Sequence, residues 1–416
     1  MALTLTNATL DGAPTALRAE GGVITQLGPD VVAHAGDEVL DGQGLALVNG
    51  LINGHGHAAM TLFRGYGSDL QLQEWLEHMI WPAEARLTTD DIYWGTRLAA
   101  IEMIRSGTTH FYDMYWHPEV VARAAEDAGI RATVGAPLLD GLNPAGISAL
   151  HDAALDSLDA LADAGPLVNA SITPHALYTV SEDSLAWVGQ LAADRDLVVQ
   201  MHLSETRREV DDWMKEHDER PAIFADRFGL LGPRTLLAHG CQLDRAELEL
   251  VAERGATVIS NPVSNMKLAG SDAFPYPLAR ACGVAVGLGT DGASSNNGLD
   301  LFADTKVFAL LQKHAAGDPT AITAAEALEL AQGRRSPQLG GRPIEVGAPA
   351  DFLLIDTRLP SLNPGPLTEN LVYAPVSDMV HTTVVHGRVL MHDRVIDGAD
   401  EIVAEAHARA DRVINC

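Results

Sequence analysis

The sequence predicts an α/β fold, a (β/α)8 barrel of the TIM type joined to a small β-sandwich that both ends of the chain build together. Three observations lead to this prediction. Eight apolar runs alternate with amphipathic segments of helical period through the middle of the chain. Short runs of alternating polarity occupy both ends. Histidines and acids recur where the apolar runs stop, and such barrels collect their reacting groups at the carboxyl ends of the strands.

The two ends of the chain have the same character. From Leu3 to Leu47, short alternating runs are separated by Asp-Gly and Gly-Gly pairs, which are hairpin signals. Short strand patterns return at Ala350 to Asp356 and at Met379 to Met391, before a final helix from about Ala399 to Val413. We therefore expect residues 1–51 and 345–416 to form one composite β-sandwich domain, and residues 52–344 to form the barrel.

Strands and helices alternate through the barrel region. The expected strands end near His57, Asp113, Pro137, His175, His202, His239, Pro262 and Asp291. The expected helices are Asp90 to Ser106, His117 to Ala128, Ile147 to Ala164, Ser181 to Asp194, Glu205 to Phe228, Asp244 to Arg254 and Pro277 to Cys282, followed by a long helical region from Leu301 to Gln332. A pattern of this kind favours a parallel sheet closed by its helices.

Composition excludes several classes of partner. The 416 residues suffice for one large domain and a smaller one, and no apolar run approaches the roughly 20 residues that a bilayer span needs. The formal net charge of -28 disfavours nucleic acids and anionic membranes. Three cysteines without a C-x-x-C pair and an N-terminus without an export signal indicate a cytoplasmic protein. A homo-oligomer is compatible with the sequence, which leaves the oligomeric state open.

The stretch from Leu51 to Met60 contains the first candidate metal ligands. His55 and His57 end an apolar strand, and residues at i and i+2 of a strand project to the same side. Two neighbouring buried imidazoles would repel each other if charged, whereas a divalent cation satisfies both. The alternative is a pair of unrelated histidines, because a two-residue signal recurs by accident. Metal binding therefore requires further ligands downstream.

Two later strands supply those ligands. His202 ends the run that begins at Leu197, and Asp291 ends the run that begins at Val284. Imidazoles combined with a carboxylate suit zinc or iron, so these two residues complete a plausible set with His55 and His57.

Two more residues lie close to this set in the sequence. Glu205 follows His202 by an odd offset and reaches the same side only if the chain bends there; otherwise it is a first-turn acid of a helix. In the first case it is a candidate proton carrier for hydrolysis. His239 ends another apolar run and, taken alone, reads as a core histidine.

A nucleotide site is the alternative reading of residues 287–292, which fit G-x-G-x-x-G. A dinucleotide site needs a helix that opens at this point within an early βαβ unit, and residues 293–298 read as a loop. We therefore reject a nucleotide site. Cytidine-type deaminases combine H-x-E with P-C-x-x-C, and this combined signature is also absent, because none of the three cysteines forms a P-C-x-x-C motif.

The motifs together resemble the amidohydrolase superfamily, and within it the branch of 5-methylthioadenosine/S-adenosylhomocysteine deaminases and triazine hydrolases. The residues that carry the resemblance are Asn53-Gly-His-Gly-His-Ala-Ala-Met60, Pro174-His175, His202-Leu-Ser-Glu-Thr206, Ala238-His239, Ser264-Asn-Met-Lys-Leu268 and Gly289-Thr-Asp-Gly292. Six ordered motifs across nearly the whole chain are far more specific than any one of them. One departure is Gly56, where family members often have threonine, and it changes packing rather than ligation.

The resemblance implies a barrel flanked by a β-sandwich and one divalent metal, Zn²⁺ with Fe²⁺ as the alternative. The implied ligands are His55, His57, His202 and Asp291. Glu205 would move protons, and His239 with Asp291 would orient and activate the water. Because no lysine precedes Lys215, the bridging lysine carbamate of two-metal members is missing, and we expect a single ion.

The resemblance also implies two substrate contacts. Glu84 matches the acid that binds ribose hydroxyls in the nucleoside deaminases, and His175 matches their substrate-contacting histidine. The alternatives are a helix-start acid at Glu84 and a packed loop histidine at His175.

The expected reaction is deamination of an adenine nucleoside, in which water attacks C6 while Glu205 delivers protons to the ring nitrogen and then to the departing ammonia. Family members that accept S-adenosylhomocysteine place arginines after the third strand, but this chain has no Lys or Arg between Arg131 and Arg195, and Ala136 stands in the expected region. We therefore expect a neutral 5'-substituent, as in 5'-methylthioadenosine, 5'-deoxyadenosine or adenosine. The competing interpretations are loss of chloride or methylthio from a triazine and, outside enzymes, a metal-free scaffold protein.

Overall fold

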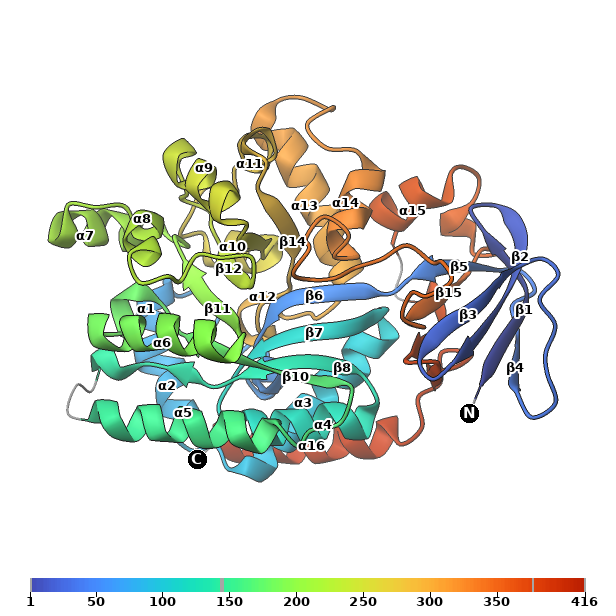
Figure 1. Cartoon of the computed structure of the whole chain (residues 1–416), viewed down its shortest axis with the longest axis horizontal. Helices are drawn as coiled ribbons and strands as arrows, with labels where there is room; N and C mark the ends of the chain where they lie inside the picture. The colour runs from blue at the N-terminus through green and yellow to red at the C-terminus, as the bar shows by residue number, and fades with distance from the viewer. Residues whose placement is uncertain (1, 143–145, 376–377, 415–416) are drawn as a thin grey trace.

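In the computed structural model, residues 2–142, 146–375 and 378–414 are described. Parallel strands surround the centre of the larger part, and a smaller sheet lies beside it (Figure 1). The barrel strands run in the order β6 (Leu51–Gly56), β7 (Thr108–Met114), β8 (Arg131–Gly135), β10 (Val168–Pro174), β11 (Val198–Leu203), β12 (Thr235–His239), β13 (Thr257–Ser260) and β14 (Ala285–Leu288), and β9 (Pro137–Leu138) pairs with β10. The predicted fold class is confirmed.

The first and last strands of the barrel are brought together near their carboxyl ends. The amide of Asp291 donates to the carbonyl of His55 at 3.1 Å, three residues after β14 ends. Every residue of β6, β11, β12 and β13 is buried. Burial on both faces explains why these strands are continuous apolar runs rather than alternating ones.

The helices of the barrel follow the predicted positions closely. They include α3 (Thr89–Arg105), α4 (Pro118–Ala128), α5 (Ile147–Leu161), α6 (Glu182–Arg195), α9 (Arg245–Arg254) and α11 (Tyr276–Cys282). α10 (Pro262–Leu268) was not predicted, and it begins where the seventh barrel strand was expected to end.

The predicted helix from Glu205 to Phe228 is wrong, because the segment forms two helices, and the predicted long helical region from Leu301 to Gln332 also contains two helices. The region from Glu205 to Phe228 forms α7 (Arg207–His217) and α8 (Pro221–Asp226), since α7 ends at a left-handed Asp218 and Pro221 opens α8. The region from Leu301 to Gln332 forms α13 (Leu301–Ala316), which ends at a left-handed Gly317, and α14 (Ala324–Ala331), which Thr323 caps. Residues 293–298, expected to be a loop, contain a single helical turn, α12 (Ala293–Asn296).

The smaller sheet combines both ends of the chain. Its strand order is β17 (Arg388–Met391), β16 (Val380–Val385), β15 (Phe352–Asp356), β5 (Leu45–Asn49), β1 (Leu3–Leu10), β2 (Ala13–Glu20) and β3 (Val23–Gly28), with β4 (Glu38–Asp41) paired to β1. β5 and β15 are antiparallel, with Leu47 opposite Leu354. Figure 1 shows the N-terminal strands beside the C-terminal ones at the right of the view. The division of the chain at residues 51/52 and 344/345 stays a prediction.

One glycine joins the two parts. Gly50 lies between β5 and β6, and a Cβ atom built on it would meet Oγ1 of Thr109 at 2.3 Å. A side chain at this position would therefore push the small sheet away from the second barrel strand.

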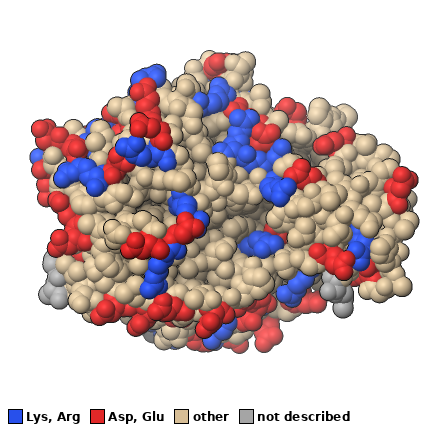
Figure 2. Space-filling model, in the orientation of Figure 1, with Lys and Arg blue, Asp and Glu red and all other residues tan. Residues whose placement is uncertain are grey.

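The last helix returns to the barrel. α16 (Ala399–Ile414) packs against α3, and Arg409 pairs with Asp90 at 2.6 Å. No helix among the described residues is long and apolar enough to cross a membrane. On the face shown in Figure 2, Asp and Glu are spread widely and are interspersed with Lys and Arg.

Candidate active site

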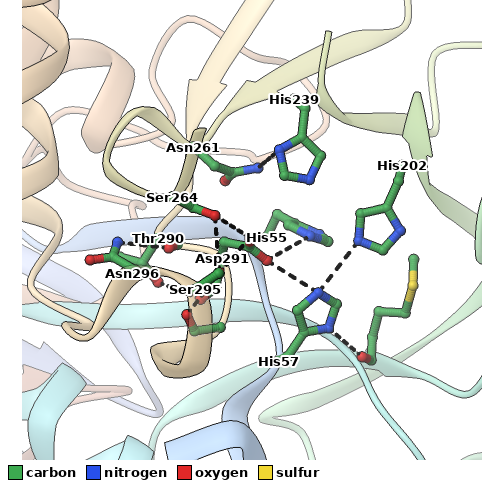
Figure 3. Close-up of polar contacts among 12 residues, drawn as sticks. His55, His57, His202, His239, Asn261, Ser264, Thr290, Asp291, Ser295 and Asn296 are labelled. Atoms are coloured by element: carbon green, nitrogen blue, oxygen red, sulfur yellow. Dashed lines mark hydrogen bonds and ion pairs between the residues drawn. The ribbon is translucent and has the colours of Figure 1, made fainter. Parts of the chain in front are cut away.

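The predicted metal ligands meet at the carboxyl end of the barrel (Figure 3). Nε2 of His57 lies 3.2 Å from Oδ1 of Asp291, and Nε2 of His55 lies 3.6 Å from the same oxygen. Nε2 of His202 lies 3.4 Å from Nε2 of His57. Residues from the first, fifth and eighth barrel strands therefore present their ligand atoms to one point.

The donor set fits a divalent metal ion. Two groups, His55 with His57 and Asp291, and His55 with His202 and His239, each have ligand atoms within 4.8 Å of one another. Nε2 of His55 is buried and has no hydrogen-bond partner among the described residues. An uncompensated buried nitrogen is costly, and a cation at the centre of these atoms would satisfy it.

Backbone carbonyls fix the orientation of two of the imidazoles. Nδ1 of His57 lies 2.8 Å from the carbonyl oxygen of Met114, and Nδ1 of His202 lies 2.8 Å from that of His175. Because a carbonyl oxygen only accepts, each Nδ1 carries the proton and each Nε2 keeps its lone pair for the shared point. Such outer contacts are what orient metal-binding histidines.

Two serine hydroxyls hold the carboxylate of Asp291. Oγ of Ser264 donates to Oδ2 at 2.6 Å and Oγ of Ser295 donates to it at 2.9 Å, which leaves Oδ1 facing His55 and His57. Burial alone would raise the pKa of Asp291, but the contacts with these two histidines hold it well below its usual range.

Asn53 places the loop that carries this aspartate. Its Oδ1 accepts from the amide of Thr290 at 3.0 Å, and its Nδ2 donates to Oγ1 of Thr290 at 2.8 Å. Sequence reasoning missed the roles of Asn53, Ser264 and Ser295. Asn53 and Ser264 lie inside motifs that we singled out, whereas nothing local distinguished Ser295 from a loop residue.

Glu205 reaches the site through the bend that its odd offset requires. β11 ends at Leu203, and Ser204 adopts a left-handed conformation with a φ of 52°. Oε2 of Glu205 then lies 3.7 Å from Nε2 of His239, and the residue is only 7% exposed. Burial, with the nearby charge of Asp291 adding to it, raises the pKa of Glu205 to about 8.

His239 is held from the opposite side by two amides. Its Nδ1 lies 3.0 Å from Nδ2 of Asn265 and 3.3 Å from Nδ2 of Asn261, so Nε2 faces the site. Burial lowers the pKa of His239, which favours the neutral ring. The sequence of this strand alone predicts a histidine that only packs in the core. The structure instead places its side chain at the site.

A pocket with about 710 Å³ of unfilled space, part of it open to solvent, leads to these residues. Its polar lining includes His57, Glu84, His175, His202, Glu205, His239, Asp291 and Ser295, and its apolar lining includes Leu72, Trp75, Leu76, Trp81, Met114, Trp116, Leu139 and Leu268. Among the described residues that line it, none is Lys or Arg.

One wall of this pocket was not predicted. α1 (Leu72–Trp75), a π-helical turn η2 (Leu76–Ile80) and α2 (Trp81–Glu84) form a continuous helical segment that carries Glu84 to the pocket. Burial raises the pKa of Glu84. His175 faces the pocket from the end of β10, where Nδ1 contacts Oγ1 of Thr179 at 2.9 Å and burial lowers the pKa of the ring to about 3.

Comparison with known proteins shows which family this chain is similar to. Residues 46–390 match the amidohydrolase family. A 5'-deoxyadenosine deaminase of Methanoregula boonei is 47% identical over 388 residues, which cover 92% of this chain and 88% of that protein. A 5-methylthioadenosine/S-adenosylhomocysteine deaminase of Archaeoglobus fulgidus is 41% identical over 95% of this chain and 94% of that protein.

Solved structures show the same architecture. An adenosine deaminase from Xanthomonas campestris with bound zinc superposes with a TM-score of 0.92 at 32% identity, covering 100% of this chain and 98% of that one. Atrazine chlorohydrolase from Arthrobacter aurescens TC1, complexed with zinc, reaches a TM-score of 0.90 at 21% identity, covering 98% of this chain and 100% of that one, and this likeness concerns the fold alone. The chain belongs to the amidohydrolase family, whose members depend on a metal.

Proposed function

We propose that this protein is a metal-dependent hydrolytic deaminase of adenine nucleosides with a small neutral 5'-substituent. Its substrates would be 5'-methylthioadenosine, 5'-deoxyadenosine or adenosine, and its products the inosine analogue and ammonia. The observation that carries the proposal is the position of Glu205, a buried acid beside the histidine and aspartate cluster at the inner end of the pocket. The relatives named as deaminases of 5'-deoxyadenosine and 5-methylthioadenosine support it.

His55, His57, His202 and Asp291 would hold a single divalent ion, for which we propose Zn²⁺ with Fe²⁺ as the alternative. When bound, such an ion lowers the pKa of a water molecule and so makes a nucleophile available at neutral pH. The zinc in the adenosine deaminase structure supports this choice. A free thiol at Cys241 and at Cys282 is consistent with the cytoplasmic location that we also propose.

Glu205 would carry the protons of the reaction. Its carboxyl group gives a proton to the ring nitrogen next to C6 as water adds to C6. The carboxylate then takes the remaining proton of the added hydroxyl group and passes it to the amino group, which leaves as ammonia. Oδ1 of Asp291 would accept the first proton of the attacking water, and Nε2 of His239 would orient that water. Asp291 would release this proton once the product has left, and Glu205 would take up a proton again before the next turnover.

The outer part of the pocket would bind the ribose and the 5'-group. The carboxyl group of Glu84 would accept hydrogen bonds from the ribose hydroxyls, and His175 would contact the base. The carboxylate of S-adenosylhomocysteine would find no Lys or Arg among the described lining residues, and a buried charge without a partner is strongly disfavoured. An apolar wall favours methylthio or methyl groups instead.

The proposal is tested by an ammonia-release screen of the purified full chain, with metal analysis of the same sample. The panel contains 5'-deoxyadenosine, 5'-methylthioadenosine, adenosine and S-adenosylhomocysteine, with atrazine as the triazine control. We expect ammonia and the inosine analogue in equal amounts and about one ion per chain. Release of chloride from atrazine by metal-loaded protein, without ammonia from any nucleoside, would overturn the proposal in favour of a triazine hydrolase.

A further inference from the structure

The turn that presents Glu205 is held by a second, half-buried acid. Three consecutive backbone amides, those of Ser204, Glu205 and Thr206, donate to the carboxylate of Glu209. The distances are 2.9 Å to Oε1 and 2.8 and 3.3 Å to Oε2. Both oxygens of one side chain are therefore used to fix the main chain between β11 and α7.

The same turn is fixed from its carbonyl side. The amide of Gly240 donates to the carbonyl of Leu203 at 3.0 Å, and the amide of Gln242 donates to that of Ser204 at 2.9 Å. These bonds come from the loop after β12, so they link the turn to the strand end that carries His239. The left-handed Ser204 is thus held by partners on both sides.

The carboxyl group of Glu205 has no such support of its own. Among the described residues it has no hydrogen-bond partner, and Nε2 of His239 lies 3.7 Å from its Oε2, beyond the range of a normal hydrogen bond. Its free oxygens suit a group that must exchange protons with a substrate. The main chain beneath it is therefore the main determinant of where this carboxyl group points.

Ordinary helix capping does not explain all three contacts of Glu209. It is the third residue of α7, and a capping box requires only its bond with the amide of Thr206. The amides of Ser204 and Glu205 lie outside the helix. Glu247 of α9 also completes a capping box, with Asp244, but its other contacts are with Arg220 at 2.5 Å and with the amide of Ala222 at 3.0 Å in α8, and not with the turn before its own helix. Glu209 makes no ion pair with a described Lys or Arg.

We propose that Glu209 is a positioning residue, which clamps the turn at residues 204–206 and thereby holds the carboxyl group of Glu205 where it can exchange protons with the substrate. The expected effect on kcat rests on the proposed deaminase function. The structural part of the inference, the clamp, concerns only the main chain.

The test compares Glu209→Gln with Glu247→Gln as the matched control. Each variant removes one acceptor oxygen from a capping-box glutamate, but only Glu209 accepts directly from the amides of the turn below Glu205. The measurements are kcat and KM for ammonia release, metal content, melting temperature and hydrogen exchange of the peptide that spans residues 203–209. Glu209→Asp, which keeps the charge but shortens the side chain by one methylene, is the second variant.

We expect Glu209→Gln to lower kcat about 10²-fold, the effect of a misplacement of roughly 1 Å, with KM within about threefold and metal content unchanged. The amides at 204–206 should exchange faster in this variant. Glu247→Gln should lower the melting temperature and leave kcat within about twofold. Glu209→Asp should lower kcat as well, because the shorter side chain cannot reach all three amides. If Glu209→Gln does not fold, the kcat of Glu209→Asp decides the test.

The inference is overturned if exchange at residues 204–206 is unchanged, or if kcat falls no more in the Glu209 variants than in Glu247→Gln. A loss of kcat that follows a loss of metal would also overturn it. If the wild-type protein releases no ammonia from any nucleoside, the proposed function fails, while the exchange measurement still decides whether the clamp exists.

Discussion

Replacing Glu205 by glutamine tests the central step of the mechanism. The change keeps the volume of the side chain and removes its ability to carry a proton. General acid–base catalysis contributes about 10² to 10⁴ in rate, so kcat should fall by that factor, which corresponds to about 3 to 5 kcal/mol of transition-state stabilisation. Because Glu205 is outside the predicted ligand set, metal content should stay unchanged.

The pH dependence adds a second readout. Burial raises the pKa of Glu205 to about 8, so at pH 7 roughly nine in ten carboxyl groups hold the proton that the reaction first uses. The active form is the protonated one. The wild-type kcat/KM should therefore be level below about pH 8 and decline above it, and the residual activity of Glu205→Gln should lack this decline.

The assay is ammonia release from 5'-deoxyadenosine between about pH 6 and pH 9, on samples of known metal content. Glu249→Gln is a suitable control, because it makes the same chemical change at an exposed position of α9. It should leave kcat and its pH profile unchanged. The reasoning is refuted if Glu205→Gln keeps more than a tenth of the wild-type kcat, or if its profile still declines near pH 8.

Three further predictions follow from contacts around the site. Ser264→Ala removes a 2.6 Å hydrogen bond to the charged Asp291, worth about 1.5 to 3 kcal/mol, and should weaken metal affinity about tenfold or more in a competition titration; an unchanged affinity would contradict this. The kcat/KM for 5'-methylthioadenosine should exceed that for S-adenosylhomocysteine at least tenfold, because the described pocket lining offers no cation, and equal values would remove the argument. Burial raises the pKa of Asp113 to about 7. Between about pH 4 and pH 7, the Asp113 carboxyl group is therefore protonated in the native state and ionised in the unfolded state. The free energy of unfolding should therefore fall by up to about 4 kcal/mol across that range from this group, and in urea unfolding Asp113→Asn should gain stability relative to wild type as pH rises; a constant difference would show that Asp113 does not titrate there.

The sequence could predict those parts of the fold and site that depend on local periodicity. Alternation along one strand was enough to place His55 and His57 on the same side, and long apolar runs located the barrel strands. It could not predict contacts made across the barrel. Ser295 and Ser264 converge on Asp291 only because two separate strand ends meet, and a hydroxyl carries no local sign of its partner.

The helix predictions that differ from the structure also show the limits of local periodicity. Apolar periodicity continues from α7 into α8, so it does not register the left-handed Asp218 or the break that Pro221 imposes. The helical segment from Leu72 to Glu84 was missed because its apolar residues face the pocket as well as the core, which blurs a one-sided helical stripe.

The strand ends themselves show how the site departs from strand geometry. Ser204, His239 and Asp291 all adopt left-handed conformations, with φ values of 52°, 73° and 61°, at or just after the ends of β11, β12 and β14. Each costs about 1 to 2 kcal/mol for a residue with a side chain, and glycine would adopt the same conformation at less cost. Side chains are nevertheless present, and those of His239 and Asp291 point into the cluster. Strain of this kind concentrates where a side chain has a task, so these turns complete a site whose other histidines, His55 and His202, are placed by the regular strands β6 and β11.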